Sequence, residues 1–363
     1  MKSKIFPAVV GLGYVGLPTF LRLNRKFKTI GFDINLRRIK GLKSFQDINS
    51  EFKKKDLKLK NNSIITYEKN LLKNCNFYIV TVPTPIYPNN KPDLRSLNSA
   101  CKIIAKNIND GDIIFFESTV YPGLTEDLKK KFFRKKKIWL GYSPERINPG
   151  DKDHTIKNIK KIVSIEKCPI EIKERVFSVY KTITKNLVFS TSIKNAEMSK
   201  VIENIQRDIN IAFMNEILMV CEKLNLNFDE VLDLAKTKWN FLDFSPGLVG
   251  GHCLPVDPYY LYTLAKKRGY DANFMLAGRK VNDFLVKFLE KKILEKIKKI
   301  ENKKILICGL TYKANVSDIR NSLALKIFKN ISVKKNISVE AFDPIINIKN
   351  FQNKKINNKI KNL

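Results

Sequence analysis

The first half of the chain alternates short apolar runs with amphipathic stretches, and this pattern constrains the fold more than any other feature of the sequence. Such an alternation is typical of β–α units that build a parallel sheet. We expect strands at residues 8–10, 29–32, 77–82, 113–117, 138–141, 161–164 and 187–189. The first strand should start after Pro7, because proline cannot donate to the hydrogen-bond ladder of a sheet. The predicted fold class is α/β, with an N-terminal doubly wound, Rossmann-like parallel sheet.

The first expected strand runs into GLGYVG, which places Gly11, Gly13 and Gly16 in G-x-G-x-x-G spacing. A glycine motif between a strand and a helix, followed by an acidic residue, is the fingerprint of dinucleotide binding. The three glycines would allow the tight turn, admit the pyrophosphate and let the helix pack on the strand. Asp33 ends the next strand and would accept hydrogen bonds from the ribose hydroxyls, so NAD is favoured over NADP. The alternative is an ordinary glycine turn in an α/β protein.

Two further expected strands end in hydroxyl and proline residues, in VTVPTPI and ESTVYPG. Ligands bind at the carboxyl ends of strands in open α/β sheets, so Thr84 and Thr119 are placed to contact cofactor or substrate. Each threonine could equally cap the following helix. The cofactor-binding candidates are Gly11, Gly13, Tyr14, Val15, Gly16, Asp33, Arg38, Pro83, Thr84 and Thr119.

The stretch GLVGGHCLPVDPYY places Cys253 directly after a Gly-Gly-His sequence and four residues before Asp257. A nucleophilic thiol needs a nearby cation or helix terminus, and Lys200 or His252 could provide the cation. Gly250 and Gly251 would let a ligand come close to the backbone. The alternative is a buried structural cysteine, which is the commoner role of a lone cysteine.

Two other segments carry polar side chains suited to catalysis. Lys200 and Asn204 lie four residues apart on one face of an expected helix, where they could stabilise a developing oxyanion. Most helix lysines are simply solvated, so this pattern alone is weak. Glu145 and Arg146 follow an expected strand in YSPERINPGD, and Glu145 could orient a water molecule. A salt bridge within the loop is the simpler interpretation of this pair.

The second half of the chain has a different organisation. Residues 193–235 contain neither glycine nor proline and space their apolar residues as one or two long helices do. A second strand, glycine turn and helix begin near Lys303, as a weak internal repeat of the N-terminal unit. We expect an NAD-binding domain at residues 1–192, a central helical domain at 193–300 and a partial, truncated Rossmann-like domain at 301–363.

The formal net charge of +33 raises the alternative of nucleic-acid binding. The lysines are spread along the whole chain without a nucleic-acid-binding motif, so we expect no specific nucleic-acid partner. The six cysteines are widely spaced and there are only two histidines, so no metal site is predicted. No apolar run is long enough to cross a membrane, and no signal peptide is recognisable, so a cytoplasmic location is expected.

Together, the motifs GLGYVGLP, VPTP, STVYPG, SPER and GGHC resemble those of the UDP-glucose/GDP-mannose dehydrogenase family, from Val9 to about Asp343. SPERINPGD and PGLVGGHC look most like the bacterial UDP-N-acetylhexosamine 6-dehydrogenases, which act on UDP-N-acetylglucosamine or UDP-N-acetylgalactosamine. The resemblance implies oxidation of the sugar C6 alcohol to the uronic acid by NAD, through a thiohemiacetal and a thioester on Cys253. It also implies a role in surface polysaccharide synthesis.

The same resemblance assigns roles to individual residues. The implied catalytic residues are Cys253, Lys200, Asn204, Asp257, Glu145 and Thr119. The implied substrate-binding residues are Glu145, Arg146, Lys200, Asn204, Gly250, Gly251, Lys313 and Arg320. A homodimer through the central helix is implied as well, and the C-terminal domain would bind the UDP-sugar. The alternatives are UDP-glucose or UDP-N-acetylmannosamine as substrate, or an inactive truncated remnant that binds NAD and a protein partner.

Overall fold

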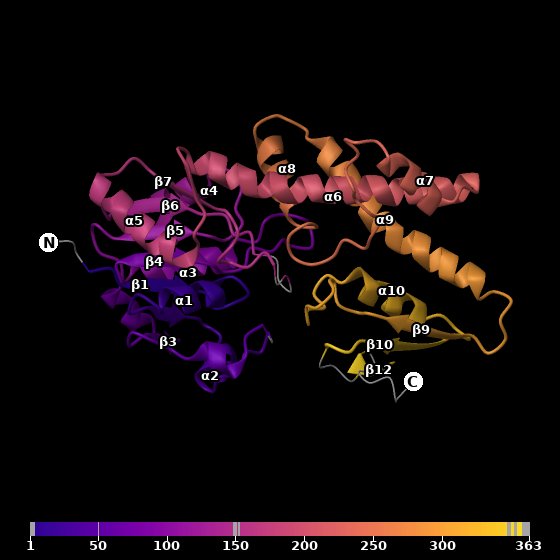
Figure 1. Ribbon diagram of the computed structural model, residues 1–363, viewed down its shortest axis with the longest axis horizontal. Helices are drawn as coiled ribbons and strands as arrows, with labels where there is room; N and C mark the ends of the chain where they lie inside the picture. The colour runs from indigo at the N-terminus through magenta and orange to yellow at the C-terminus, as the bar shows by residue number, and fades with distance from the viewer. Residues whose placement is uncertain are drawn as a thin grey trace. The chain divides into compact units, whose positions relative to one another are not determined.

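The computed structural model describes residues 4–49, 51–147, 151, 153–346, 350–351 and 354–357. The chain separates into two compact units, residues 1–202 and residues 203–363. In Figure 1 the first unit is coloured from indigo to magenta, and the second runs through orange to yellow.

The first unit is built on an eight-stranded sheet with the order β3-β2-β1-β4-β5-β6-β7-β8 (Figure 1). The strands are β1 (Pro7–Val10), β2 (Ile30–Phe32), β3 (Ile64–Thr66), β4 (Phe77–Val80), β5 (Ile113–Phe116), β6 (Trp139–Tyr142), β7 (Lys161–Ile165) and β8 (Leu187–Ser190). Neighbouring strands are parallel except β6 and β7, which are antiparallel. The chain moves outward from β1 to β3 on one side and from β4 to β6 on the other. The order therefore reverses between β1 and β4, and a crevice for a ligand is expected at their carboxyl ends.

Helices cover both faces of this sheet. They are α1 (Gly16–Leu23), α2 (Leu36–Lys43), α3 (Arg95–Ala105), α4 (Leu124–Phe132) and α5 (Ile170–Ile183), with short 3-10 helices at Lys54–Leu57 and Lys69–Asn74. Successive strand residues point to opposite faces, so Ala8 and Val10 pack in the core beneath α3 and α4. Val9 packs in the other core, with residues of α1, α2 and α5. Burial on both faces explains why these strands are continuously apolar.

The α/β fold with a large, mainly parallel sheet is confirmed, and all seven expected strands are present with ends that differ by one or two residues. One prediction is wrong, because β1 includes Pro7, which pairs with Phe77 of β4. Proline is tolerated as the first residue of a strand, where its missing N–H breaks no interior part of the ladder. The three-residue strand β3 was not predicted, because its residues do not form part of an extended apolar run.

Helix α6 (Ile193–Leu224) begins in the first unit and continues into the second, where α7 (Phe228–Lys236), α8 (Asp257–Lys267) and α9 (Asn273–Lys296) follow. The prediction of one or two long helices here is confirmed. A small sheet with the order β11-β12-β10-β9 completes the second unit. Its elements are β9 (Lys304–Cys308), α10 (Leu323–Ser332), β10 (Ser338–Phe342), β11 (Asn350–Phe351) and β12 (Lys354–Asn357). The division into three domains stays a prediction.

The predicted internal repeat extends to the hydrogen bonds of the two glycine turns. Gly11 N donates to Phe32 O at 2.8 Å, and Gly309 N donates to Phe342 O at the same distance. In each repeat an aspartate at the end of the second strand accepts a backbone N–H from the turn: Asp33 at 2.8 Å and Asp343 at 2.7 Å. The two turns are therefore alike, and each opens a parallel pair of strands, β1 with β2 and β9 with β10.

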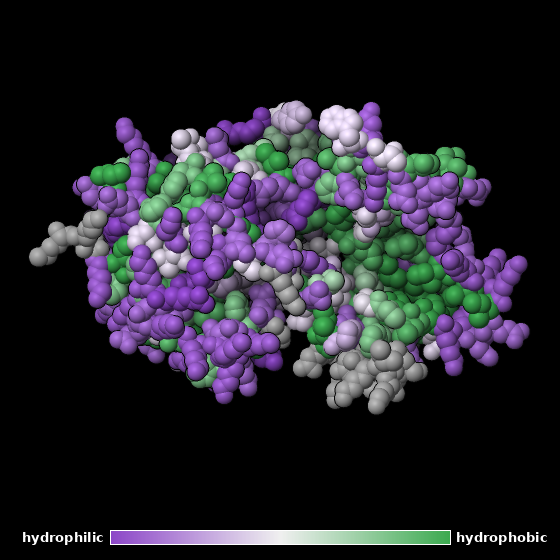
Figure 2. All heavy atoms as spheres, viewed as in Figure 1, coloured by the Kyte–Doolittle hydropathy of each residue, from purple (hydrophilic) through white to green (hydrophobic). Residues whose placement is uncertain are grey.

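The surface is mostly hydrophilic on the face of the first unit shown in Figure 2, whereas hydrophobic residues gather along α9 in the second unit. On α6, large apolar side chains are also exposed at helical spacing: Phe213 is 51% exposed, Val220 43% and Leu224 62%. None of the helices in the described part of the chain combines the length and hydropathy that crossing a bilayer requires.

Candidate active site

The glycine turn after β1 has the geometry of a nucleotide-binding turn. Gly11 has a φ of 99°, which strongly favours glycine. A Cβ on Gly16 would overlap the carbonyl oxygen of Gly11, so α1 can pack this closely only with glycine at this position. By contrast, no heavy atom lies within 4 Å of a Cβ built on Gly13. The backbone at Gly13 is therefore open to a ligand, with Tyr14 and Val15 leading into the first turn of α1.

The peptide groups of Leu12 are held from two sides. Asp33 accepts a hydrogen bond from Leu12 N at 2.8 Å, and Arg38 Nε donates to Leu12 O at 2.7 Å. Arg38 is buried and forms an ion pair with Asp47. Its Nη2 atom is also buried and has no hydrogen-bond partner among the described residues. Such a donor, next to the open backbone at Gly13, fits a bound dinucleotide that would supply the acceptor.

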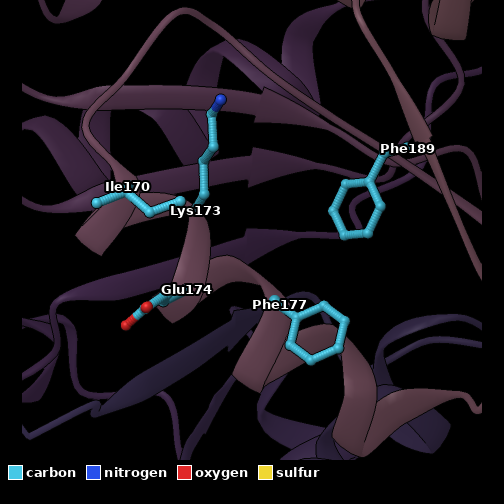
Figure 3. Close-up of a pocket in the computed structure, with 5 residues that line it drawn as sticks. All are labelled: Ile170, Lys173, Glu174, Phe177 and Phe189. Carbon is cyan, nitrogen blue, oxygen red and sulfur yellow. The ribbon is translucent and has the colours of Figure 1, made fainter.

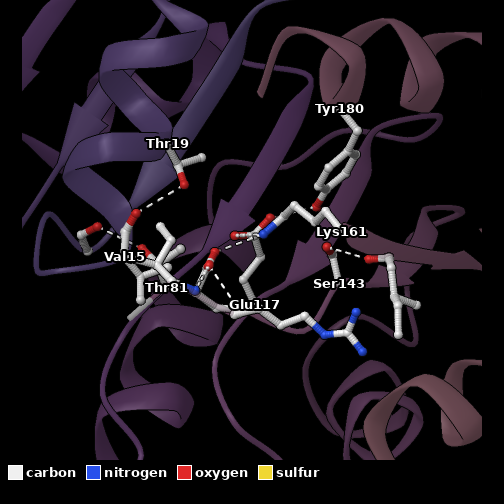
Figure 4. Close-up of polar contacts among 12 residues, drawn as sticks. Val15, Thr19, Thr81, Glu117, Ser143, Lys161 and Tyr180 are labelled. Carbon is white, nitrogen blue, oxygen red and sulfur yellow. Dashed lines mark hydrogen bonds and ion pairs between the residues drawn. The ribbon is translucent and has the colours of Figure 1, made fainter. Parts of the chain in front are cut away.

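Thr81 belongs to this turn although the sequence did not single it out. Its hydroxyl donates to Gly11 O at 2.7 Å, at the position that a Gly16 side chain would overlap (Figure 4). Thr81 N donates to Val10 O at 2.9 Å, which joins the end of β4 to the end of β1. The signal for Thr81 in VTVPTPI is a hydroxyl residue directly after an apolar strand, whereas the sequence-based prediction named Thr84.

The loops after β4 and β5 lie beside each other, because these strands are parallel neighbours. Ser118 Oγ donates to Val82 O at 2.6 Å and ties the two loops together. This places Pro83, which is exposed, and Thr84 and Thr119, which are half-buried, at the edge of the sheet that also carries the glycine turn. The sequence-predicted cofactor residues are thus gathered at one edge of the first unit.

Glu145 follows β6 at the same edge and is almost completely buried. It forms an ion pair with Lys161 at 2.8 Å, and Lys161 in turn pairs with Glu117 at 3.1 Å. Arg146 is half-buried and donates from Nη1 to Lys160 O at 3.3 Å. The predicted salt bridge within the loop is not what holds Glu145. Sequence reasoning missed Lys161 and Glu117, because a charged residue at a strand end is usually solvated.

The second unit brings Asn204 and Asp257 together. Both are 1% exposed, and Asn204 Nδ2 donates a hydrogen bond to Asp257 Oδ2. Arg207 Nη2 donates to Asn204 Oδ1, which fixes the orientation of the amide. The Cys253 carbonyl accepts from Asp257 N at 2.9 Å, so Cys253 stands at the start of α8 with an exposed side chain. Exposure argues against the alternative of a buried structural cysteine.

Gly250 and Gly251 are required by the packing of the C-terminal segment. A Cβ on Gly250 would lie 2.7 Å from Asn321 O, and one on Gly251 would lie 2.7 Å from the Tyr312 ring. Asn321 Nδ2 also donates to Gly251 O at 3.0 Å. The close approach that these glycines permit is therefore that of Tyr312 and Asn321, and their contact with a substrate stays a prediction.

The residue before the thiol is also tied to the C-terminal segment. His252 Nε2 lies 3.0 Å from Asp318 Oδ2, and Arg320 Nη2 lies 2.7 Å from the same oxygen. Burial would raise the pKa of Asp318, but the hydrogen bonds from His252 and Arg320 hold this pKa well below its usual range. Arg320 is 59% exposed at its side chain, and Lys313 is half-buried in the same segment.

Lys200 is half-buried on α6, one turn before Asn204. It belongs to the first unit, whereas Asp257 and Cys253 belong to the second. The joint role of Lys200 with Asn204 therefore stays a prediction, and the partner of Asn204 in the second unit is Asp257.

A hollow in the first unit lies apart from these residues. It is formed by α5 and β8, with Phe177 and Phe189 stacked at 6.3 Å between ring centroids (Figure 3). The other lining residues are Ile170, Lys173 and Glu174. β8 is the last strand at one side of the sheet, and four strands separate it from β1 and the glycine turn. The hollow is therefore no part of the candidate active site.

Comparison with known proteins decides the family. Three domain models of the UDP-glucose/GDP-mannose dehydrogenase family match the chain: the NAD binding domain at residues 5–184, the central domain at 194–284 and the UDP binding domain at 306–362. The chain belongs to the UDP-glucose/GDP-mannose dehydrogenase family. The sequence-based predictions of this family, of NAD as cofactor and of a nucleotide-sugar dehydrogenase are thereby confirmed.

Individual members of the UDP-glucose/GDP-mannose dehydrogenase family are similar over most of their length. Protein CapL of Staphylococcus aureus is 44% identical over 338 residues, which are 89% of this chain and 78% of that protein. The UDP-N-acetyl-D-glucosamine 6-dehydrogenase of Pseudomonas aeruginosa is 44% identical over 349 residues, which are 93% and 82% of the two chains. The solved UDP-D-ManNAc dehydrogenase of Pyrococcus horikoshii is 30% identical with a TM-score of 0.83, covering 94% of this chain and 84% of that one.

Proposed function

We propose that this family member oxidises the C6 alcohol of UDP-N-acetylglucosamine or UDP-N-acetylgalactosamine to the carboxylate, consuming two NAD. The observation that carries the proposal is the exposed Cys253 at the start of α8, four residues before a buried Asp257 that Asn204 holds. The N-terminus of a helix favours negative charge nearby, which suits a thiolate nucleophile. The 44% identity to a UDP-N-acetyl-D-glucosamine 6-dehydrogenase supports the substrate class.

The proposed chemistry passes through a covalent bond to Cys253. The C6 carbon first loses a hydride and its hydroxyl group loses a proton, which gives an aldehyde. The Cys253 thiolate adds to the aldehyde carbon, the oxygen takes up a proton, and a thiohemiacetal forms. Loss of a second hydride and of that hydroxyl proton gives a thioester, and attack by water breaks the C–S bond and releases the carboxylate and the thiol. NAD, when bound, supplies the acceptor for each hydride, and covalent capture keeps the aldehyde from escaping between the two oxidations.

Other residues bind and orient in this proposal. The Asn204 amide, fixed by Arg207 and Asp257, would stabilise negative charge on the C6 oxygen together with Lys200. Glu145 and Thr119 would orient the hydrolytic water from the carboxyl ends of β6 and β5. Arg146, Gly250, Gly251, Lys313 and Arg320 are the proposed substrate contacts.

The test is NADH formation by the purified chain with NAD and a panel of UDP-sugars. The panel contains UDP-N-acetylglucosamine, UDP-N-acetylgalactosamine, UDP-N-acetylmannosamine and UDP-glucose, since one similar solved structure is a UDP-D-ManNAc dehydrogenase. We expect two NADH per N-acetylhexosamine consumed, loss of this activity in Cys253→Ala, and retention in the matched control Cys308→Ala, which also removes an exposed thiol. No NADH with any sugar, from folded protein that binds NAD, would refute the oxidation and favour an inactive NAD-binding remnant.

We also propose that the chain forms a homodimer through α6. The exposed Phe213, Val220 and Leu224 form an apolar face at helical spacing, and covering them would remove this surface from water. Light scattering should give twice the chain mass for the wild type. Val220→Lys should reduce this to the mass of a single chain, whereas Leu234→Lys on α7 should leave the dimer mass unchanged.

The enzyme would work in the cytoplasm, where widely spaced cysteines stay reduced, and its product would feed surface polysaccharide synthesis.

A further inference from the structure

The first unit buries three ionisable side chains in direct contact: Glu117, Glu145 and Lys161. Their side chains are 0%, 6% and 1% exposed. Lys161 Nζ lies 2.8 Å from Glu145 Oε2 and 3.1 Å from Glu117 Oε2. Tyr180 adds its hydroxyl, which donates to Glu117 Oε1 at 2.9 Å. Figure 4 shows Lys161 and Tyr180 converging on Glu117.

The sheet topology explains why these residues meet. Glu117 follows β5 and Glu145 follows β6, which are parallel neighbours, so both stand at the same edge. Strand β7 runs antiparallel to β6, so its first residue, Lys161, lies beside the end of β6. Tyr180 reaches the cluster from α5. Four elements therefore each contribute one ionisable group to the cluster: the ends of β5 and β6 contribute the two glutamates, β7 the lysine and α5 the tyrosine.

One ammonium group can neutralise only one of the two carboxylates. Glu145 receives three donors: Lys161 Nζ at 2.8 Å, Arg146 N at 2.7 Å and Ile147 N at 2.6 Å. Among the described residues, Glu117 receives hydrogen bonds from Lys161 and from the neutral Tyr180 alone. Because a buried charge needs compensating partners, the negative charge belongs on Glu145 and the proton on Glu117.

The directions of the pKa shifts agree with this distribution. Burial raises the pKa of Glu117 to about 7, although the charge of Lys161 opposes the shift. Burial would also raise the pKa of Glu145, but the charge and hydrogen bond of Lys161 and the two backbone N–H groups lower it. Burial would lower the pKa of Lys161, yet the two carboxyl groups raise it.

We propose that Lys161 is a positioning residue for Glu145: it fixes an ionised carboxylate at the end of β6, while Glu117 carries the proton that keeps the buried cluster neutral. This inference rests on the proposed function, in which Glu145 orients the water that hydrolyses the thioester. Lys161 is 1% exposed and acts through the carboxylate of Glu145. It keeps the Glu145 carboxylate able to accept a proton from that water.

The first test is the pH profile of NADH formation by Lys161→Met, expressed per folded molecule. Without the ammonium group Glu145 takes up a proton, so kcat at pH 7 should fall at least about tenfold and should recover as the pH is raised. Lys129→Met is the matched control, because Lys129 pairs with Glu166 at 2.6 Å outside the cluster. Its profile should match that of the wild type. An unchanged profile in Lys161→Met would overturn the proposal, since a merely structural lysine changes only the folded fraction.

The second test needs no turnover and also serves if Lys161→Met does not fold. Glu117 has a raised pKa in the folded state, so folded wild-type protein holds a proton that the unfolded chain releases. Stability should therefore decline as pH rises from about 4.5 to about 7, and Glu117→Gln should remove this part of the decline. Equal pH dependence in both proteins would overturn the inference. Absence of NADH from the wild type would refute only the proposed function.

Discussion

The pair Gly16→Ala and Gly13→Ala should separate folding from NAD binding at one turn. A Cβ on Gly16 would overlap the Gly11 carbonyl oxygen and the Thr81 hydroxyl, and would lie 2.9 Å from the Gly11 carbonyl carbon. Because the obstructing atoms include backbone, relief requires a shift of α1 or of the turn. A Cβ on Gly13 meets no heavy atom within 4 Å. Gly13→Ala should therefore leave the packing of the turn unchanged and obstruct only a ligand that binds against it.

Overpacking of this kind costs about 1–3 kcal/mol. For a unit of this size each kcal/mol lowers Tm by about 2–4 °C, so Gly16→Ala should melt about 2–12 °C below the wild type. Gly13→Ala should stay within about 0.5 kcal/mol of wild-type stability but raise the Kd for NAD at least about tenfold, or ~1.4 kcal/mol. Differential scanning calorimetry and isothermal titration with NAD measure the two effects. Equal melting of both variants, or wild-type NAD binding by Gly13→Ala, would refute the reasoning.

Three further predictions concern the second unit. Asn204→Ala should lower kcat at least about tenfold and the free energy of unfolding by about 1–3 kcal/mol, because the buried Asp257 carboxylate loses a hydrogen-bond donor. Steady-state kinetics and urea denaturation measure the two effects, and wild-type values of both would contradict the prediction. Gly250→Ala should displace the loop that carries Cys253 and so change the rate at which iodoacetamide alkylates this thiol. An unchanged alkylation rate would disprove this prediction. Asp318→Asn should lower the free energy of unfolding near neutral pH but not in acid. The folded-state pKa of Asp318 is depressed, so its contribution to stability is present above the unfolded-state pKa of about 3.9 and is lost as the pH falls below that value. A stability difference between variant and wild type that persists in acid would contradict this prediction.

Much of the first unit could be predicted because its signals are local. Continuous apolar runs such as FYIV at Phe77–Val80 indicate strands buried on both faces, and the glycine spacing after Val10 indicates a nucleotide turn. The short strand β3 could not be predicted, since its three residues lie between the polar stretches KLKNNS and YEK. The placement of Pro7 in β1 depended on which neighbouring strand pairs with it, and that is a property of the whole sheet.

The candidate site divides in the same way. Local sequence patterns singled out these residues: Cys253 follows Gly-Gly-His, and Lys200 and Asn204 lie four positions apart on an expected helix. The partners of these residues come from distant segments, as with Asn204 and Asp257, which are 53 positions apart. No spacing rule relates such residues, and their pairing depends on how α6 and α8 pack.

By itself the sequence determined the fold class and the nucleotide turn and singled out Cys253 as the candidate thiol, because each of these rests on the chemistry of a few consecutive residues. Only the tertiary structure decided that Tyr312 and Asn321 fill the space beside Gly250 and Gly251, and that Lys161 lies between Glu117 and Glu145. The physical reason is burial. A lysine or glutamate that would be solvated in an isolated strand must find its partners when the sheet closes over it, and those partners are set by strand order and direction.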